Sequence, residues 1–146
     1  HNYTIDKTSD GRGDITSYTL GELKKFDFGS YFGNEFAGVT LPTLDEFLDL
    51  VKDSDAEIIN IELKSQKNRS TEIVRRTLDA VKEKGVLERV IISSFDPRIL
   101  KAVKAEEPKC KTAFLYPTND PHVCRFLAVP FFVAKAVNAD ILHHFY

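Results

Sequence analysis

Glu62 and Lys64 place a carboxylate and an ammonium two positions apart at the end of the apolar segment Ile59–Lys64. Side chains alternate along a β-strand, so Glu62 and Lys64 are expected to share one face, opposite the neighbouring apolar side chains. A strand buried against helices gains no stability from charges that point inward. The pair therefore predicts a site for a metal ion, an anion or both. The alternative is a surface ion pair at a frayed strand end.

The chain has 146 residues, of which 42% are hydrophobic and 29% charged, as in an ordinary globular domain. It is shorter than the ~250 residues of a complete eight-stranded α/β barrel. The formal net charge of −2 comes from interspersed charges of both signs, which argues against a nucleic-acid partner. The apolar run Phe126–Val137 is too short to span a bilayer, so we expect no stable membrane insertion.

Cys110 and Cys124 form no CxxC motif. We expect reduced structural thiols, with a single disulfide as the alternative. We also expect a cytoplasmic protein.

Apolar segments of strand length alternate with segments of helical periodicity after residue 44. The expected strands are Glu57–Leu63, Val90–Ser94, Thr112–Tyr116 and Asp140–His144. The expected helices are Leu20–Phe26, a helix capped by Thr43, Ser70–Lys84, Pro97–Ala105 and a packed helix within 123–137. Strands separated by helices indicate parallel βαβ units, and continuously apolar strands indicate burial on both faces.

Functional side chains of parallel α/β sheets gather at the carboxyl ends of the strands. The polar residues at those ends are Glu62, Lys64, Ser93, Ser94, Tyr116, His143 and His144. We expect one of the two histidines to face the rim, and Ser94, Phe95 and Tyr116 to contact substrate or simply to turn or pack. No Cys/His set has zinc-ligand spacing, which disfavours zinc.

Residues 1–44 are irregular and interleave glycines with aromatic side chains. We expect the aromatic cluster after the first helix to form a small loop-supported core, with a carbohydrate platform as the sharper alternative.

Several motifs, in order along nearly the whole chain, resemble the glycerophosphodiester phosphodiesterase family. The opening His1–Gly11 resembles its His-Asp-x-x-(Leu/Val)-Asp-Arg-Thr-Thr-x-Gly signature, and Phe28–Gly33 looks like its Gly-Ser-Trp-Phe insertion. Leu41–Glu46 is similar to its Ile-Pro-Thr-Leu-Glu-Glu helix start. Asn60–Lys64 and Ile92–Asp96 match its next two strand motifs.

This resemblance implies an α/β fold of the TIM-type (β/α) barrel class, here partial. We expect a single domain over 1–146, with an insertion region at 1–44 and about four βα units at 45–146. It implies metal-dependent hydrolysis of glycerophosphodiesters to glycerol 3-phosphate and an alcohol. His1 matches a catalytic histidine, Glu62 a ligand of Mg²⁺ or Ca²⁺, and Lys64 a lysine near the phosphate. Substrate contacts are expected at Lys64, Ser94, Phe95, Tyr116 and His143.

The chain departs from the family pattern in two ways. Asn2 replaces the usual aspartate, and the family's His-Arg motif, Glu-x-Asp pair and late Trp-Thr-Val-Asn strand are missing from these residues. We therefore expect part of the site to lie outside 1–146, and these residues alone to be inactive. They are also expected to self-associate through open barrel edges. A related phosphodiesterase acting on phospholipids or lysophospholipids and a non-catalytic scaffold are the alternatives.

Overall fold

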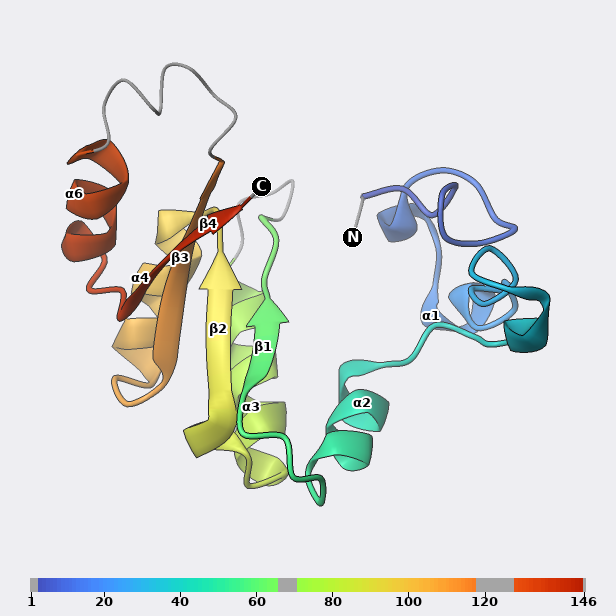
Figure 1. Ribbon diagram of the computed structural model, residues 1–146, viewed down its shortest axis with the longest axis horizontal. Coiled ribbons are helices and arrows are strands. Elements are labelled where there is room, and N and C mark those ends of the chain that lie inside the picture. The colour runs from blue at the N-terminus through green and yellow to red at the C-terminus, as the bar shows by residue number, and fades with distance from the viewer. Residues whose placement is uncertain (1–2, 66–70, 118–127, 146) are drawn as a thin grey trace. The chain divides into compact units, whose positions relative to one another are not determined.

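Four strands form one parallel sheet in the computed structural model, which describes residues 3–65, 71–117 and 128–145 (Figure 1). The strands are β1 (Ile59–Glu62), β2 (Val90–Ser94), β3 (Lys111–Pro117) and β4 (Ile141–Phe145). Each pairs in parallel with the next, so the order in the sheet equals the order in the chain. All four predicted strands are confirmed, with ends that differ by at most two residues.

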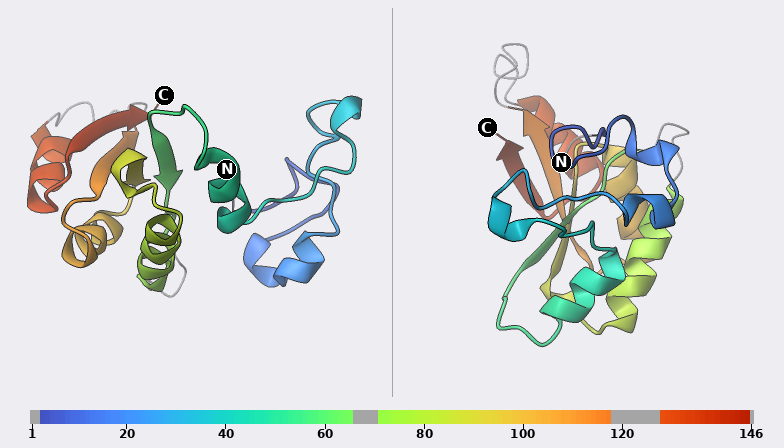
Figure 2. Two further views of the ribbon diagram at one scale, coloured as in Figure 1. Left: turned by 90° about the horizontal axis from the view of Figure 1, so that it is seen from below. Right: turned by 90° about the vertical axis from the view of Figure 1, so that its right-hand side faces the viewer.

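Helices cover one face of this sheet (Figures 1 and 2). They are α2 (Leu44–Val51), α3 (Glu72–Glu83), α4 (Pro97–Glu106) and α6 (Ala128–Ala136). A doubly wound sheet reverses its strand order and carries helices on both faces, whereas a (β/α) barrel keeps chain order and places its helices outside. The described strands and helices therefore form part of a barrel wall. None of the described helices combines the length and the apolar character needed to cross a bilayer.

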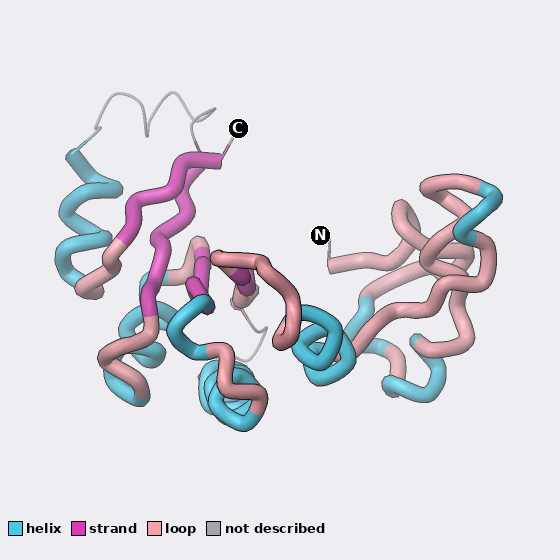
Figure 3. Tube along the Cα trace, turned by 60° about the horizontal axis from the view of Figure 1, so that its bottom comes forward, coloured by secondary structure: helices cyan, strands magenta, loops and turns pink. Residues whose placement is uncertain are grey.

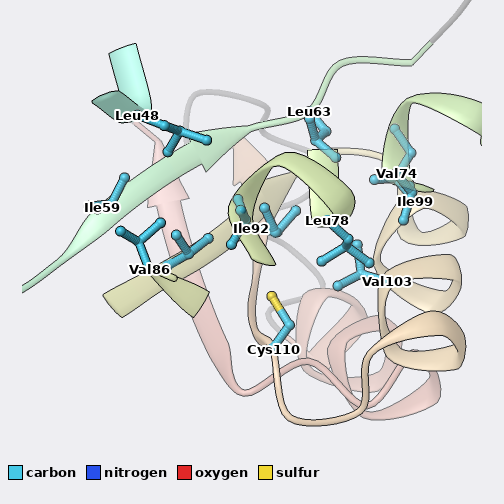
Figure 4. Close-up of a cluster of buried hydrophobic side chains, with 12 residues drawn as sticks. Leu48, Ile59, Leu63, Val74, Leu78, Val86, Ile92, Ile99, Val103 and Cys110 are labelled. Carbon is cyan, nitrogen blue, oxygen red and sulfur yellow. The ribbon is translucent and has the colours of Figure 1, made fainter. Parts of the chain in front are cut away.

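The main hydrophobic core lies between the sheet and helices α2, α3 and α4 (Figure 4). From the sheet it takes Ile59, Leu63, Val90 and Ile92, which belong to one alternating set of side chains. Cys110 is a free, fully buried thiol in the same core, and burial raises its pKa. The opposite set of side chains, which contains Glu62, faces away from the helices and toward the interior of the barrel.

Local sequence signals define where the helices begin and end. Gly85 follows α3 with a φ of 68°, a conformation that glycine adopts without strain. Asp96 caps α4 by accepting a hydrogen bond from the Arg98 amide, and Pro97 occupies a first-turn position, as predicted. Arg89 donates to four backbone carbonyls at the end of α2 and in the segment that follows it, those of Val51, Lys52, Ser54 and Ala56.

Residues 1–43 form a separate compact unit that consists mostly of loops (Figure 3). It contains η1 (Ile15–Ser17), α1 (Leu20–Leu23) and η2 (Asn34–Phe36). The predicted start of α1 is confirmed, because Thr19 and Glu22 form a reciprocal capping box. The helix ends at Leu23, three residues earlier than expected.

The Asp27 carboxylate organises the loop that follows α1. It accepts hydrogen bonds from the amides of Gly29, Ser30 and Gly38 and from the Ser30 hydroxyl. These donors, led by the Ser30 hydroxyl, hold the pKa of Asp27 far below its ordinary value. Glycine is required at position 29, where an added Cβ would lie 1.9 Å from the Phe36 carbonyl oxygen.

The aromatic cluster of this loop is less buried than expected. Tyr31, Phe32 and Phe36 are 60%, 75% and 41% exposed, although the rings of Phe32 and Phe36 meet edge to face at 5.3 Å. The expectation of a small core is therefore wrong for these three rings. Asp27 and its backbone hydrogen bonds, rather than aromatic packing, define this part of the loop.

Candidate active site

The Glu62 and Lys64 side chains meet at the carboxyl end of β1. Lys64 Nζ donates to Glu62 Oε1 at 3.0 Å, and the two side chains are 30% and 22% exposed, respectively. Their contact agrees with the shared face that strand alternation predicts. A half-buried carboxylate beside an ammonium at this edge can offer an oxygen ligand to a cation and a positive charge to an anion.

The strand register places Glu62 in a row of side chains that crosses the sheet. Glu62 is paired with Ser93 of β2, Ser93 with Ala113 of β3, and Ala113 with Ile141 of β4. Paired residues of parallel strands project from the same face of the sheet. Ser93 therefore presents its hydroxyl beside Glu62, on the interior face of the barrel wall.

Ser94, which was predicted to contact substrate, belongs to the opposite, helix-facing set. Its side chain is fully buried. Its hydroxyl donates to the Leu63 carbonyl at 2.7 Å and accepts from the Asp96 amide at 3.0 Å. These bonds join the end of β1 to the turn that starts α4, so Ser94 has a structural role in this arrangement.

Tyr116 and Phe95, which were also predicted to contact substrate, lie in different surroundings. Tyr116 is partly buried and packs against the second hydrophobic cluster, formed by Leu100 of α4, Phe114 of β3 and residues of α6. This placement favours the packing alternative for Tyr116. Phe95 follows β2 and is 39% exposed, so its ring is accessible to a ligand.

His143 lies on the interior face but at a distance from Glu62. It is paired with Leu115 and is exposed. Three strand spacings of about 4.8 Å separate β4 from β1, which corresponds to roughly 14 Å across the sheet. The structure therefore brings Glu62, Lys64 and Ser93 together and leaves His143 on a more distant part of the same face. His1 lies outside the described residues.

A polar cluster beside the site is difficult to predict from the sequence. Asp96 accepts hydrogen bonds from the Ser65 hydroxyl at 2.8 Å and from the Arg98 guanidinium. Mainly because of Arg98, the pKa of Asp96 is lowered to about 2. The Asp-Pro pair signals the helix start, but the 31-residue separation between Ser65 and Asp96 hides their contact.

Glu62 is the metal ligand that the sequence predicts at this site. No group of three or more His, Cys, Asp or Glu side chains in the described ranges is placed to hold a metal ion. Mg²⁺ and Ca²⁺ bind at least six oxygen ligands. Glu62 thus fits as one ligand of such an ion but cannot complete a coordination shell.

A parallel sheet in chain order, with helices outside and a charged pair at its carboxyl edge, defines part of a (β/α) barrel with a rim site. The chain belongs to the glycerophosphoryl diester phosphodiesterase family, which it matches over residues 1–143. This match confirms the resemblance seen in the ordered motifs.

Two curated relatives are named glycerophosphodiester phosphodiesterase. The one from Caldanaerobacter subterraneus subsp. tengcongensis is 39% identical over 146 residues, which is all of this chain and 57% of that protein. The one from Bacillus altitudinis is 34% identical over 95 residues, 65% of this chain and 39% of that protein. The chain thus spans about half the length of these curated relatives, or less.

Solved structures share the fold. An Oleispira antarctica phosphodiesterase, in complex with the product sn-glycerol-3-phosphate, aligns with a TM-score of 0.81 at 24% identity over 99% of this chain and 56% of that one. A glycerophosphodiester phosphodiesterase from Agrobacterium tumefaciens aligns with a TM-score of 0.75 at 20% identity over 99% of this chain and 55% of that one. These likenesses confirm the partial barrel.

Proposed function

We propose that the protein carrying this chain hydrolyses glycerophosphodiesters to glycerol 3-phosphate and an alcohol with the help of Mg²⁺ or Ca²⁺. The observation that carries the proposal is the 3.0 Å contact between Lys64 and Glu62 at the carboxyl end of β1. Membership of the family supports the reaction class. The Oleispira phosphodiesterase, with sn-glycerol-3-phosphate bound, supports the product for a protein of the same fold.

Lys64, His1 and Glu62 have different roles in the proposed reaction. A phosphodiester gains negative charge on its non-bridging oxygens as water attacks phosphorus, and the Lys64 ammonium stabilises that charge. The new P–O bond to water forms as the P–O bond to the alcohol breaks, and the attacking water releases a proton to solvent. His1 donates the proton that the leaving alkoxide needs. Glu62 would hold the divalent cation, which when bound supplies additional positive charge to the phosphoryl group.

We further propose that residues 1–146 by themselves bind metal weakly and turn over little substrate. Glu62 is one oxygen ligand, and the described residues form no group of three or more His, Cys, Asp or Glu side chains that could hold a metal ion. The remaining ligands are proposed to come from the rest of the barrel.

A cytoplasmic location remains a prediction.

A lysophospholipid is the second candidate substrate, and one observation favours it. Tyr31, Phe32 and Phe36 expose their rings in the loop of the N-terminal unit, and an exposed apolar surface is what a lipid substrate requires. Comparing turnover of glycerophosphocholine with that of lysophosphatidylcholine by the complete protein separates the two candidates.

The test of the main proposal uses the complete protein that carries residues 1–146. With Mg²⁺ and glycerophosphocholine, we expect release of glycerol 3-phosphate that stops when EDTA is added. Glu62→Ala is expected to lose turnover, because the cation loses a ligand. Glu88→Ala, an exposed change in η3 (Leu87–Arg89) before β2, is the matched control and should keep turnover. A Glu62→Ala protein with wild-type turnover would place the cation site elsewhere, and a complete wild-type protein without turnover would support the scaffold alternative.

A further inference from the structure

Ser93 and Ser94 end β2, and they differ in whether the side-chain hydroxyl has hydrogen-bond partners among the described residues. The Ser94 hydroxyl has a donor and an acceptor partner, at 2.7 and 3.0 Å. The Ser93 side chain is equally buried, at 0% exposure, yet its Oγ has no hydrogen-bond partner among the described residues. Because buried hydroxyl groups almost always have a partner, this exception calls for an explanation.

The strand register places the Ser93 hydroxyl beside the candidate cation ligand. Ser93 is paired with Glu62, and the Leu63 amide donates to the Ser93 carbonyl at 2.8 Å, so the two strands stay in contact beyond this pair. Adjacent strands lie about 4.8 Å apart, within reach of a serine and a glutamate on one face. Ser93 is the polar side chain that β2 presents there, since Ile91 is apolar and Ala113 on the other neighbouring strand offers no polar group.

Among the residues that the structure describes, no hydrogen bond requires a hydroxyl at position 93. An alanine would leave the same backbone pairing and remove a polar atom that has no partner in the described ranges. Leaving a buried polar group without a partner costs stability. A hydroxyl in this position is therefore explained by a bond that forms in the working site rather than by the fold.

We propose that Ser93 is a positioning residue: its hydroxyl donates a hydrogen bond to the Glu62 carboxylate and orients that carboxylate toward the bound cation. This inference rests on the proposed function. Lys64 already contacts Oε1 of Glu62 from along the same strand, and Ser93 approaches from the paired strand. Carboxylate ligands of metals are commonly oriented by such hydrogen bonds, and removing one typically weakens metal binding about 10–100-fold.

The test measures Mg²⁺ binding to the complete protein by calorimetry and the melting temperature of the metal-free protein. Ser93→Ala is expected to raise the Kd for Mg²⁺ about 10–100-fold without lowering the melting temperature. Ser93→Cys, which keeps the size and offers a weaker donor, should give an intermediate Kd. Ser94→Ala is the contrasting variant and should lower the melting temperature, because its hydroxyl has two partners.

Three outcomes would overturn the inference. If Glu62→Gln weakens Mg²⁺ binding and Ser93→Ala does not, the proposed function stands and the role of Ser93 is refuted. If Ser93→Ala lowers the melting temperature as much as Ser94→Ala does, the hydroxyl serves the fold. If Glu62→Gln binds Mg²⁺ like the wild type, both the inference and the proposed function fail.

Discussion

Replacing Ser94 with alanine should destabilise the barrel wall. The hydroxyl is fully buried and bridges the Leu63 carbonyl, at 2.7 Å, and the Asp96 amide, at 3.0 Å. Its removal takes a partner away from each of two backbone groups at the junction of β1, β2 and α4. A buried group that loses its partner costs about 1–3 kcal/mol, so for two such groups we expect a loss of about 2–6 kcal/mol in the free energy of unfolding.

Urea denaturation followed by circular dichroism measures this loss as a shift of the midpoint at constant slope. Ser93→Ala is the matched control, because it removes the same atom from the adjacent position, where the hydroxyl has no partner among the described residues. We expect the control to unfold at the wild-type midpoint or slightly above it. Equal losses in the free energy of unfolding for Ser93→Ala and Ser94→Ala would refute the reasoning that only the helix-facing serine of β2 stabilises the fold.

Three further predictions concern stability and assembly. The pKa of Asp96, about 2 when folded and 3.8 ordinarily, means that its ionised form stabilises the fold above about pH 4. That contribution should decrease as the pH falls from about 4 to 2. The difference in denaturation midpoint between wild type and Asp96→Asn should therefore shrink over this range. A difference that stays constant would contradict this prediction. Arg89→Lys should lower the free energy of unfolding by about 1–2 kcal/mol, because an ammonium cannot reach the four carbonyls that the planar guanidinium contacts. An unchanged urea midpoint would contradict this prediction. Residues 1–146 expressed alone should self-associate through the exposed side chains of Ile58 beside β1 and Ile141 and Leu142 in β4; a monomer at all concentrations in sedimentation velocity would count against this.

Local patterns in the sequence predict the elements of this fold well. The strand Val90–Ser94 was found with the predicted ends, because an apolar run bounded by charged residues and an Asp-Pro helix start defines it on both sides. The helix expected over Leu20–Phe26 is shorter, since a capping box defines where a helix begins but not how far it continues.

The sequence predicts the site only in part. Alternation along one strand is enough to place Glu62 and Lys64 together. It does not decide which of Ser93 and Ser94 joins them, because consecutive residues face opposite sides and the answer depends on the register between strands. The contact between Ser65 and Asp96 likewise depends on the folded backbone.

The central claim is that the Glu62 carboxylate faces the barrel interior and binds the cation. A crystal structure of the complete protein soaked with Ca²⁺ tests it most directly, because calcium gives an anomalous signal. We predict an anomalous peak about 2.3–2.6 Å from a carboxylate oxygen of Glu62. A calcium peak bound elsewhere, with the Glu62 carboxylate turned to bulk water, would contradict the account.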